Sequence, residues 1–246
     1  MHGIPDISPG DDLAALLVAG CAESGIRLQR WDVVVVTQKV VSKAEGALVD
    51  LAAIEPSSRA RELAAIVGYD PRVVEVVMRE SIEVLRAEPG VLLCVTRHGH
   101  VTANAGVDHS NVGGVELVSV LPDDPDASAG HLRSELLPLV DGGPLAVIVC
   151  DSFGRPFRVG TVNVAVGVAG MPAISDYQGA RDTYDQPLQT TVLASADEVA
   201  AAADLVMGKV ERVPVAVLRG LRWEGEETGV APLLRPKSKD IFRRTG

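Results

Sequence analysis

Polar residues with metal-binding and anion-binding chemistry follow an apolar run in the second half of the chain. Residues 145–150 are apolar and rich in β-branched side chains, which is typical of a strand buried on both faces. Asp151 and Ser152 come next, and we expect the strand to end there because a glycine and a proline soon follow. Arg155 and Arg158 then add two cations. The pattern indicates a metal ligand beside an anion site, with an ordinary turn as the alternative.

A second segment with possible ligands is residues 105–114, which contain one acid, one amide and three glycines. Asp108 could bind a hard divalent cation, and Asn111 could donate a hydrogen bond to a nucleotide. Glycines allow the backbone to approach a ligand closely. The alternative is a polar turn without a ligand.

A third segment begins with a second buried strand, at residues 31–37. Lys39 and Lys43 follow it, interleaved with hydroxyl groups, and two such ammonium groups could hold phosphate as point charges. Taken by itself, the segment favours a solvated loop.

Composition limits the classes of function. The chain of 246 residues is 47% hydrophobic, and no apolar run reaches the length of a membrane span. The net charge of −10 argues against a nucleic-acid-binding surface. The three cysteines lie far apart in apolar runs, which indicates buried thiols rather than disulfides. We expect a cytoplasmic protein without a signal peptide.

Hydrophobic periodicity and capping residues predict a mixture of helices and strands. We expect helices over residues 11–23, 57–67, 70–79, 128–137 and 196–207, the last with a capping box of Ser195 and Glu198. We expect strands over residues 31–37, 91–95, 100–103, 116–121, 145–150, 161–168, 188–194 and 213–218. Residues 122–126 are predicted to be an acidic surface turn and residues 174–189 a loop.

The predicted elements do not alternate strictly, so the pattern favours an α+β fold over a doubly wound sheet. No linker divides the chain, and we interpret residues 1–246 as one domain. The standard nucleotide and hydrolase motifs are absent from the sequence. Met207-Gly208-Lys209 lacks the upstream glycine of a phosphate-binding loop, and there is no dinucleotide fingerprint, zinc helix or nucleophile elbow.

Five motifs occur in an order that resembles the coenzyme F420-0:L-glutamate ligase family, the gamma-glutamyl ligases of deazaflavin cofactor maturation. They are GIPDI (3–7), VVVVTQKVVSKAEG (33–46), AGVDHSNVGG (105–114), VIVCDSFGRPFRVGT (147–161) and ADEVAAAADLVMGKVERVPVAVLRG (196–220). The resemblance implies a family-specific fold of mixed, largely antiparallel sheets with packed helices, and an intertwined homodimer. The chain resembles the stand-alone form of the family, without a nitroreductase-like domain.

The same resemblance implies GTP as co-substrate, Mn²⁺ or Mg²⁺, potassium, and the substrates L-glutamate and coenzyme F420-0. Position by position, the metal ligands it implies are Asp108, Asp151 and Ser152. The GTP contacts it implies are Ile4, Pro5, Asp6, Ile7, Gln38, Lys43 and Asn111.

These residues suggest a mechanism as a hypothesis. The metal ions would bridge the GTP phosphates, and the substrate carboxylate would attack the γ-phosphate to give an acyl phosphate. The amine of glutamate would then displace phosphate from it. We expect Lys43 to contact phosphate. Arg155 and Arg158 could clamp a carboxylate or phosphodiester, which is an inference from their chemistry and not from the family.

Two other classes of function use the same residues. A metal-dependent phosphohydrolase would need the acids but no amino-acid acceptor. A non-catalytic nucleotide-binding subunit would bind GTP with metal and catalyse no reaction. Neither accounts for five motifs in order, so the sequence favours the ligase.

Overall fold

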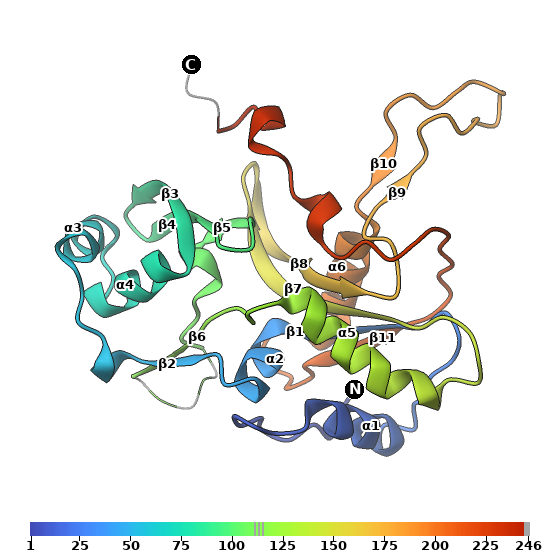
Figure 1. The fold of residues 1–246 in the computed structure, drawn as a ribbon, viewed down its shortest axis with the longest axis horizontal. Coiled ribbons are helices and arrows are strands. Elements are labelled where there is room, and N and C mark those ends of the chain that lie inside the picture. Colours follow the sequence, from blue (N-terminus) through green and yellow to red (C-terminus); the bar gives the residue numbers. More distant parts are fainter. Residues whose placement is uncertain (111, 113, 115, 244–246) are drawn as a thin grey trace.

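The computed structural model describes residues 1–110, 112, 114 and 116–243, and it consists of a body and a smaller lobe (Figure 1). Asn111, one of the predicted GTP contacts, lies outside the described residues. The body is built on a four-stranded sheet in which β1 and β7 are parallel and the other neighbours antiparallel. In order, its strands are β11 (Val215–Leu218), β1 (Val33–Thr37), β7 (Ala146–Arg155) and β8 (Arg158–Ala169).

Helices cover both faces of this sheet, each over its own hydrophobic core. On one face lie α1 (Leu13–Glu23), α2 (Gln38–Ala44) and α5 (Pro125–Leu136). On the other lies α6 (Ser195–Met207). Strand β1 and residues 146–150 of β7 are therefore buried on both sides, which explains their continuous apolar sequence. Among the described residues, no helix has the length and apolar character needed to span a bilayer.

The smaller lobe has a separate core, in which Val74, Val77, Leu92 and Cys94 are fully buried. It contains α3 (Ser58–Val67), α4 (Pro71–Arg79) and the antiparallel strands β3 (Ser81–Glu88), β4 (Val91–Thr96) and β5 (Val101–Ala103). The chain enters the lobe through β2 (Leu48–Asp50) and leaves it through β6 (Leu117–Ser119). These two strands pair with each other, so both crossings lie together.

Two further features lie outside the body and the lobe. An arm between residues 175 and 193 projects from the body, with β9 (Ser175–Asp176) and β10 (Val192–Leu193) at its base (Figure 1). The C-terminal segment runs back over the β7–β8 hairpin. Single 3₁₀ turns complete the structure, at Leu51–Ala53, Asn104–Gly106, Leu137–Leu139, Ala231–Leu233 and Lys237–Lys239.

The α+β prediction is confirmed, and so are most elements that have a local signal. Helix α4 starts as expected, with the Asp70 side chain accepting from the Arg72 N–H and Pro71 at the first helical position. Helix α3 ends at Gly68, whose φ of +80° is a left-handed conformation that costs glycine little. The predicted return of residues 100–103 beside residues 91–95 is the β4–β5 pair.

Two predictions at the polar segments were wrong. Strand β7 does not end before Asp151 but continues to Arg155, because β8 pairs with it as far as the Arg155–Arg158 turn. Residues 38–44 are not a solvated loop but helix α2, because Val41 and Ser42 bury one side of the helix against the body.

Other differences come from tertiary contacts. The capping box of Ser195 is absent, since Ala194 is the N-cap and the Ser195 hydroxyl lies 2.7 Å from the Ser175 hydroxyl. Strand β3 has no clean alternation of buried residues and was not predicted. The strand expected over residues 188–194 is reduced to Val192–Leu193 at the base of the arm.

The acidic turn at residues 122–126 is only partly on the surface. Asp126 accepts hydrogen bonds from the Val168 N–H at 2.7 Å and from the Val230 N–H at 3.0 Å. It joins α5 to the outer edge of β8 and to the C-terminal segment. At Gly167, an added Cβ would lie 2.1 Å from the Pro125 carbonyl oxygen, so α5 starts in direct contact with this strand.

We predict that Asp126→Ala lowers the free energy of unfolding by about 2–4 kcal/mol, because it leaves two partly buried N–H groups without an acceptor. Urea unfolding followed by circular dichroism measures this value. Asp123→Ala is the matched control from the same turn, since the Asp123 side chain is 91% exposed in its ion pair with Arg97, and we expect it to change stability by less than about 0.5 kcal/mol. Equal effects of the two substitutions would contradict the role of Asp126.

Candidate functional site

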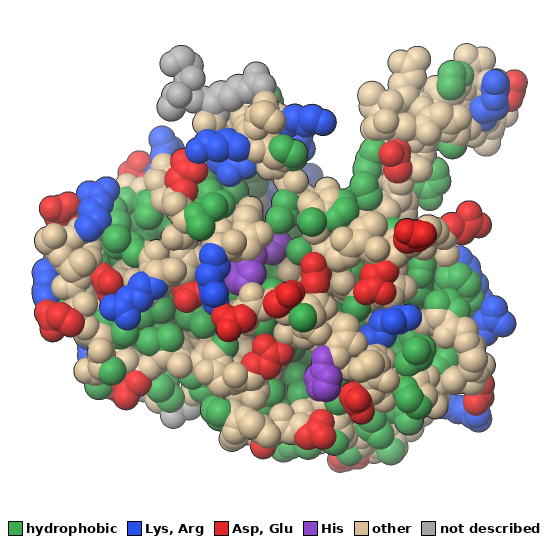
Figure 2. Space-filling model, in the orientation of Figure 1, with side chains coloured by type: hydrophobic (Ala, Val, Ile, Leu, Met, Phe, Trp, Pro, Cys, Tyr) green, Lys and Arg blue, Asp and Glu red, His purple; other side chains and the backbone are tan. Residues whose placement is uncertain are grey.

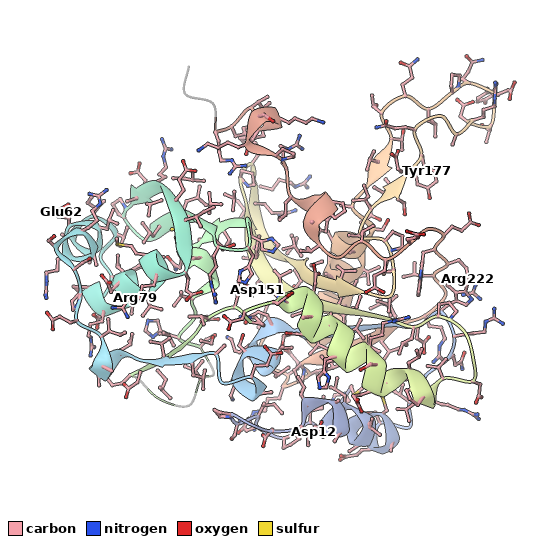
Figure 3. All side chains as sticks on the ribbon, in the orientation of Figure 1. Asp12, Glu62, Arg79, Asp151, Tyr177 and Arg222 are labelled. Atoms are coloured by element: carbon pink, nitrogen blue, oxygen red, sulfur yellow. The ribbon has the colours of Figure 1, made fainter. Side chains whose placement is uncertain are left out.

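The parallel pairing of β1 and β7 places residues from two distant segments at the same edge of the sheet. Thr37 is in register with Cys150, so Gln38 and Asp151 follow at neighbouring positions. The buried Gln38 side chain accepts from the Ser42 hydroxyl at 2.7 Å and hydrogen-bonds the Asp151 carboxylate through its amide. Figure 3 shows Asp151 where the lobe meets the body.

Asp108 reaches the same place from the lobe. Its backbone pairs with Ser119 at the end of β6, with N···O distances of 3.0 and 2.9 Å in the two directions. Its carboxylate accepts from the Ser110 N–H at 2.7 Å and from the Ser110 hydroxyl at 2.9 Å. The carboxylate is therefore fixed on a short turn beside the crossing between the lobe and the body.

Lys39 connects the two parts. From the first turn of α2, its Nζ donates to Asp108 Oδ2 at 2.6 Å and to the Ser110 hydroxyl at 2.5 Å. Its side chain is 19% exposed, so this ion pair is screened less than a surface pair would be. The cluster of Gln38, Lys39, Asp108 and Asp151 is called the acid site below. Figure 2 shows acidic, basic and histidine side chains gathered in the middle of the face of the molecule that is in view.

The two carboxylates of the acid site have different protonation behaviour. Burial raises the pKa of Asp151 to about 6, and the negative charge of Asp108 adds to this, against hydrogen bonds from the Ser152 N–H and Gln38. Burial also raises the pKa of Asp108, but hydrogen bonds from Lys39 and Ser110 outweigh it, and the pKa is below its ordinary value. Near neutral pH the site holds two carboxylates against one ammonium.

This donor set fits a divalent cation that is shared with a phosphate ligand. Within the described part of the chain, no group of three or more His, Cys, Asp or Glu side chains is arranged as a complete metal site. Mg²⁺ and similar hard ions are commonly held by one or two carboxylates, with phosphate oxygens and water completing the shell. Asp108 and Asp151 together can supply such a partial set.

Ser152 lies on the other face of the sheet, because side chains alternate along β7. Its hydroxyl bonds Asn163 Oδ1 at 2.7 Å and accepts from Lys209 Nζ at 2.7 Å. Lys209 also pairs with Asp204 at 2.8 Å. The Ser152 side chain is thus turned toward α6, while the Asp151 carboxylate is turned toward the lobe.

The N-terminal segment lies against the body, where the Met1 amino group donates to the Val215 carbonyl at 2.7 Å. Ile7 is buried in the core of that face and Ile4 packs against it, whereas Pro5 and Asp6 are exposed. Lys43 is half-buried four residues after Lys39, so the two lysines share one side of α2.

The two arginines stand at the tip of the β7–β8 hairpin. Arg155 donates to the Val159 carbonyl at 2.6 Å, and Arg158 is exposed. The Cα of Arg155 is roughly 13 Å along the strand from that of Asp151, at about 3.3 Å per residue. The structure therefore does not bring these arginines into the acid site.

Comparison with known proteins identifies the family. A family model described as F420-0:gamma-glutamyl ligase matches residues 3–220. The chain belongs to this family. A coenzyme F420:L-glutamate ligase of Methanothermobacter thermautotrophicus is 46% identical over 246 aligned residues, which cover 99% of this chain and 97% of that protein. One of Methanopyrus kandleri is 47% identical over 243 residues, covering 96% and 93%. One of Haloarcula marismortui is 41% identical over 251 residues, covering 99% and 94%.

Two lysines have contacts that the sequence did not predict. Lys39, two residues after a buried strand, was predicted as a possible phosphate contact, and in the structure it pairs with Asp108. Lys209 comes to Ser152 from 57 residues away along the chain, just after α6 ends. No local pattern could have placed it there, because its only sequence signal was an incomplete phosphate-loop motif.

We predict that Asp151→Asn flattens the dependence of stability on pH in metal-free protein. In the wild type the native carboxyl has the raised pKa of about 6, so the native state binds more protons than the unfolded state between about pH 4 and 6. Stability should therefore be highest below this window and fall as pH rises through it, by on the order of 3 kcal/mol. The asparagine variant should lose this fall.

Urea unfolding at pH 4, 5, 6 and 7 with a chelator measures this difference. Asp141→Asn, which changes an exposed carboxylate paired with Arg27, is the control and should keep the wild-type profile. An asparagine variant that retained the full wild-type fall between pH 4 and 7 would show that Asp151 has an ordinary pKa.

Proposed function

We propose that the chain is a GTP-dependent ligase that joins L-glutamate to coenzyme F420-0 as an amide and extends the product through gamma links. Relatives at 46% and 47% identity carry the name coenzyme F420:L-glutamate ligase. The observation that carries the proposal is the acid site, in which Asp108 from the lobe pairs with the Lys39 ammonium and Asp151 from the body is close enough to feel the charges of both.

A carboxylate acylates an amine poorly at neutral pH, so it has to be activated first. In the proposed reaction, a substrate carboxylate oxygen attacks the γ-phosphorus of GTP, the bond to the β–γ bridging oxygen breaks, and GDP leaves. The amine of glutamate then attacks the acyl carbon, phosphate leaves with the carbon–oxygen electron pair, and the amine proton passes to water. The products are an amide, GDP and phosphate.

The residues of the acid site have separate tasks in this reaction. Asp108 and Asp151 would hold Mn²⁺ or Mg²⁺, which when bound offsets the negative charge of the phosphates. Lys39 and Lys43 line one side of α2 and would hold the phosphates as point charges. Gln38 fixes the Asp151 carboxylate, and Pro5 and Asp6 are exposed where a nucleotide could contact them. Asn111 as a GTP contact and potassium as activator remain part of the proposal, whereas the Ser152 hydroxyl is left out because it is turned toward α6.

Turnover with product masses tests the proposal. Purified protein receives F420-0, L-glutamate, GTP, Mn²⁺ and K⁺, and the products are measured by mass spectrometry. We expect masses that rise by successive glutamyl units together with GDP. GDP formation that is unchanged by glutamate and F420-0 would instead indicate a phosphohydrolase, and GTP binding without turnover a nucleotide-binding subunit.

We predict that Asp151→Asn and Asp108→Asn each lower metal-dependent turnover of GTP by at least about 100-fold, because each removes one of two carboxylates from the cation site. Asp141→Asn is the matched control and should keep wild-type turnover. Circular dichroism of each variant checks that it folds. Near-normal turnover in Asp151→Asn would remove that residue from the site.

We also propose a homodimer, in which the arm contacts the second copy. The arm extends away from the body, and it exposes Tyr184 by 83% as well as Tyr177, Val192 and Leu193. Light scattering should give twice the mass of the chain, and replacing residues 178–190 by a short glycine linker should give a monomer. A monomeric full chain at micromolar concentration would contradict this proposal.

A further inference from the structure

A cavity lies on the β7–β8 hairpin, which also carries Asp151 of the acid site. It has a volume of about 260 Å³ and lies between the start of β5, the β7–β8 hairpin and the C-terminal segment. Its apolar walls come from all three parts of the chain and include Val101, Phe153, Val164, Leu233 and Leu234. This cavity is called the ring pocket below.

The ring pocket is next to Asp151 by the geometry of the sheet. Val164 is the cross-strand partner of Asp151, and Phe153 is two residues further along the same face of β7. A molecule bound in the ring pocket can therefore extend a reactive group to the acid site without crossing the sheet.

One polar side chain in the wall has an unused hydrogen-bonding atom. His100 is 5% exposed, packs edge-on against Phe153 with ring centroids 5.9 Å apart, and hydrogen-bonds the backbone of Val166. Val166 lies where the β7–β8 register shifts. Within the described part of the chain, His100 Nε2 has no hydrogen-bond partner.

The state of this imidazole follows from its surroundings. Burial lowers the pKa of His100 to about 4, with a smaller effect of His98, so the ring is neutral near pH 7. Because the N–H of the neutral ring is used on the Val166 backbone, Nε2 carries a lone pair. An unpaired buried acceptor is costly, and a ligand that donates to it would recover this cost.

We propose that the ring pocket binds the deazaflavin ring of coenzyme F420, with His100 Nε2 accepting a hydrogen bond from an N–H or hydroxyl group of the ring. This inference rests on the proposed function. A planar heteroaromatic ring combines apolar faces with a few donors at its edge, which matches apolar walls with one acceptor. Phe242 also lines this cavity and offers an exposed aromatic face. Its ring centroid lies 5.5 Å from that of Phe157.

Glutamate fits this cavity less well. It carries two carboxylates, which need unpaired cations, and of the two guanidinium groups that line the cavity Arg235 is exposed to solvent and Arg243 is already engaged. Arg243 pairs with Asp240 at 2.5 Å and donates to the Arg235 carbonyl at 3.2 Å. Asp197, which also lines the cavity, would repel an anionic ligand.

The test uses the free riboside of 8-hydroxy-5-deazaflavin, which has the ring but neither the phosphodiester nor the carboxylate of F420-0. It is titrated into the full chain without GTP or metal, and its fluorescence is followed. We expect saturable binding to the wild type. His100→Leu should weaken it about tenfold, and His100→Gln, which keeps an acceptor, by less than about threefold. His131→Leu, at an exposed histidine of α5, should have no effect.

Leu234→Trp is a second variant, because it fills the ring pocket from the C-terminal segment and leaves His100 in place. It should also weaken the riboside about tenfold or more, and thermal unfolding confirms that each variant folds. Wild-type affinity in both His100→Leu and Leu234→Trp would overturn the proposal. So would a wild type that ligates glutamate to F420-0 but does not bind the riboside. If the riboside binds in a way that depends on His100 but the chain has no ligase activity, the proposed ligand of the ring pocket stands. Only the proposed function is then contradicted.

Discussion

The parallel pairing of β1 with β7 is the constraint on which the rest of the structure depends. Four consecutive valines of β1 are completely buried between β11 and β7, and each contributes about 2 kcal/mol of hydrophobic stabilisation. Parallel strands need a long crossover, and here the crossover contains the whole lobe, from β2 to β6, followed by α5. The lobe is therefore inserted between two strands whose ends form one side of the acid site. Asp108, which belongs to the crossover, returns to the place where the chain left the body.

This insertion also explains the charge arrangement. Bringing Asp108 and Asp151 together in a protein of net charge −10 is unfavourable. Burial is the main cause of the raised pKa of Asp151, and the charge of Asp108 adds to it. Lys39 offsets the repulsion between the two acids by binding Asp108 across the junction of the lobe and the body. A cation that entered the site would compete with this lysine for the same carboxylate. The Lys39–Asp108 ion pair thus links the position of the lobe to whether a cation occupies the acid site.

The outer edge of β8 shows a second use of carboxylates. Asp126 and Asp197 accept from the Val168 and Ala165 N–H groups, so two helices close an edge that would otherwise be open to pairing with another strand. The same edge forms part of the ring pocket, where the C-terminal segment covers it. The acid site, the ring pocket and this edge all meet on the β7–β8 hairpin. One hairpin thereby positions two proposed binding regions.

The sequence by itself determined the helices that have caps, the buried strands, the α+β class and the two acidic segments, because these depend on neighbours within a few residues. It also led to the family through five motifs in order. Only the tertiary structure decided that Asp151 lies inside a hairpin strand, that Ser152 faces away from it, and that Lys39 pairs with Asp108 near it. Pairing partners such as β8 are distant in the chain, and one residue of register decides the face on which a side chain lies. For the same reason Arg155 and Arg158 looked adjacent to the site in sequence, while the extended strand carries them to its far end.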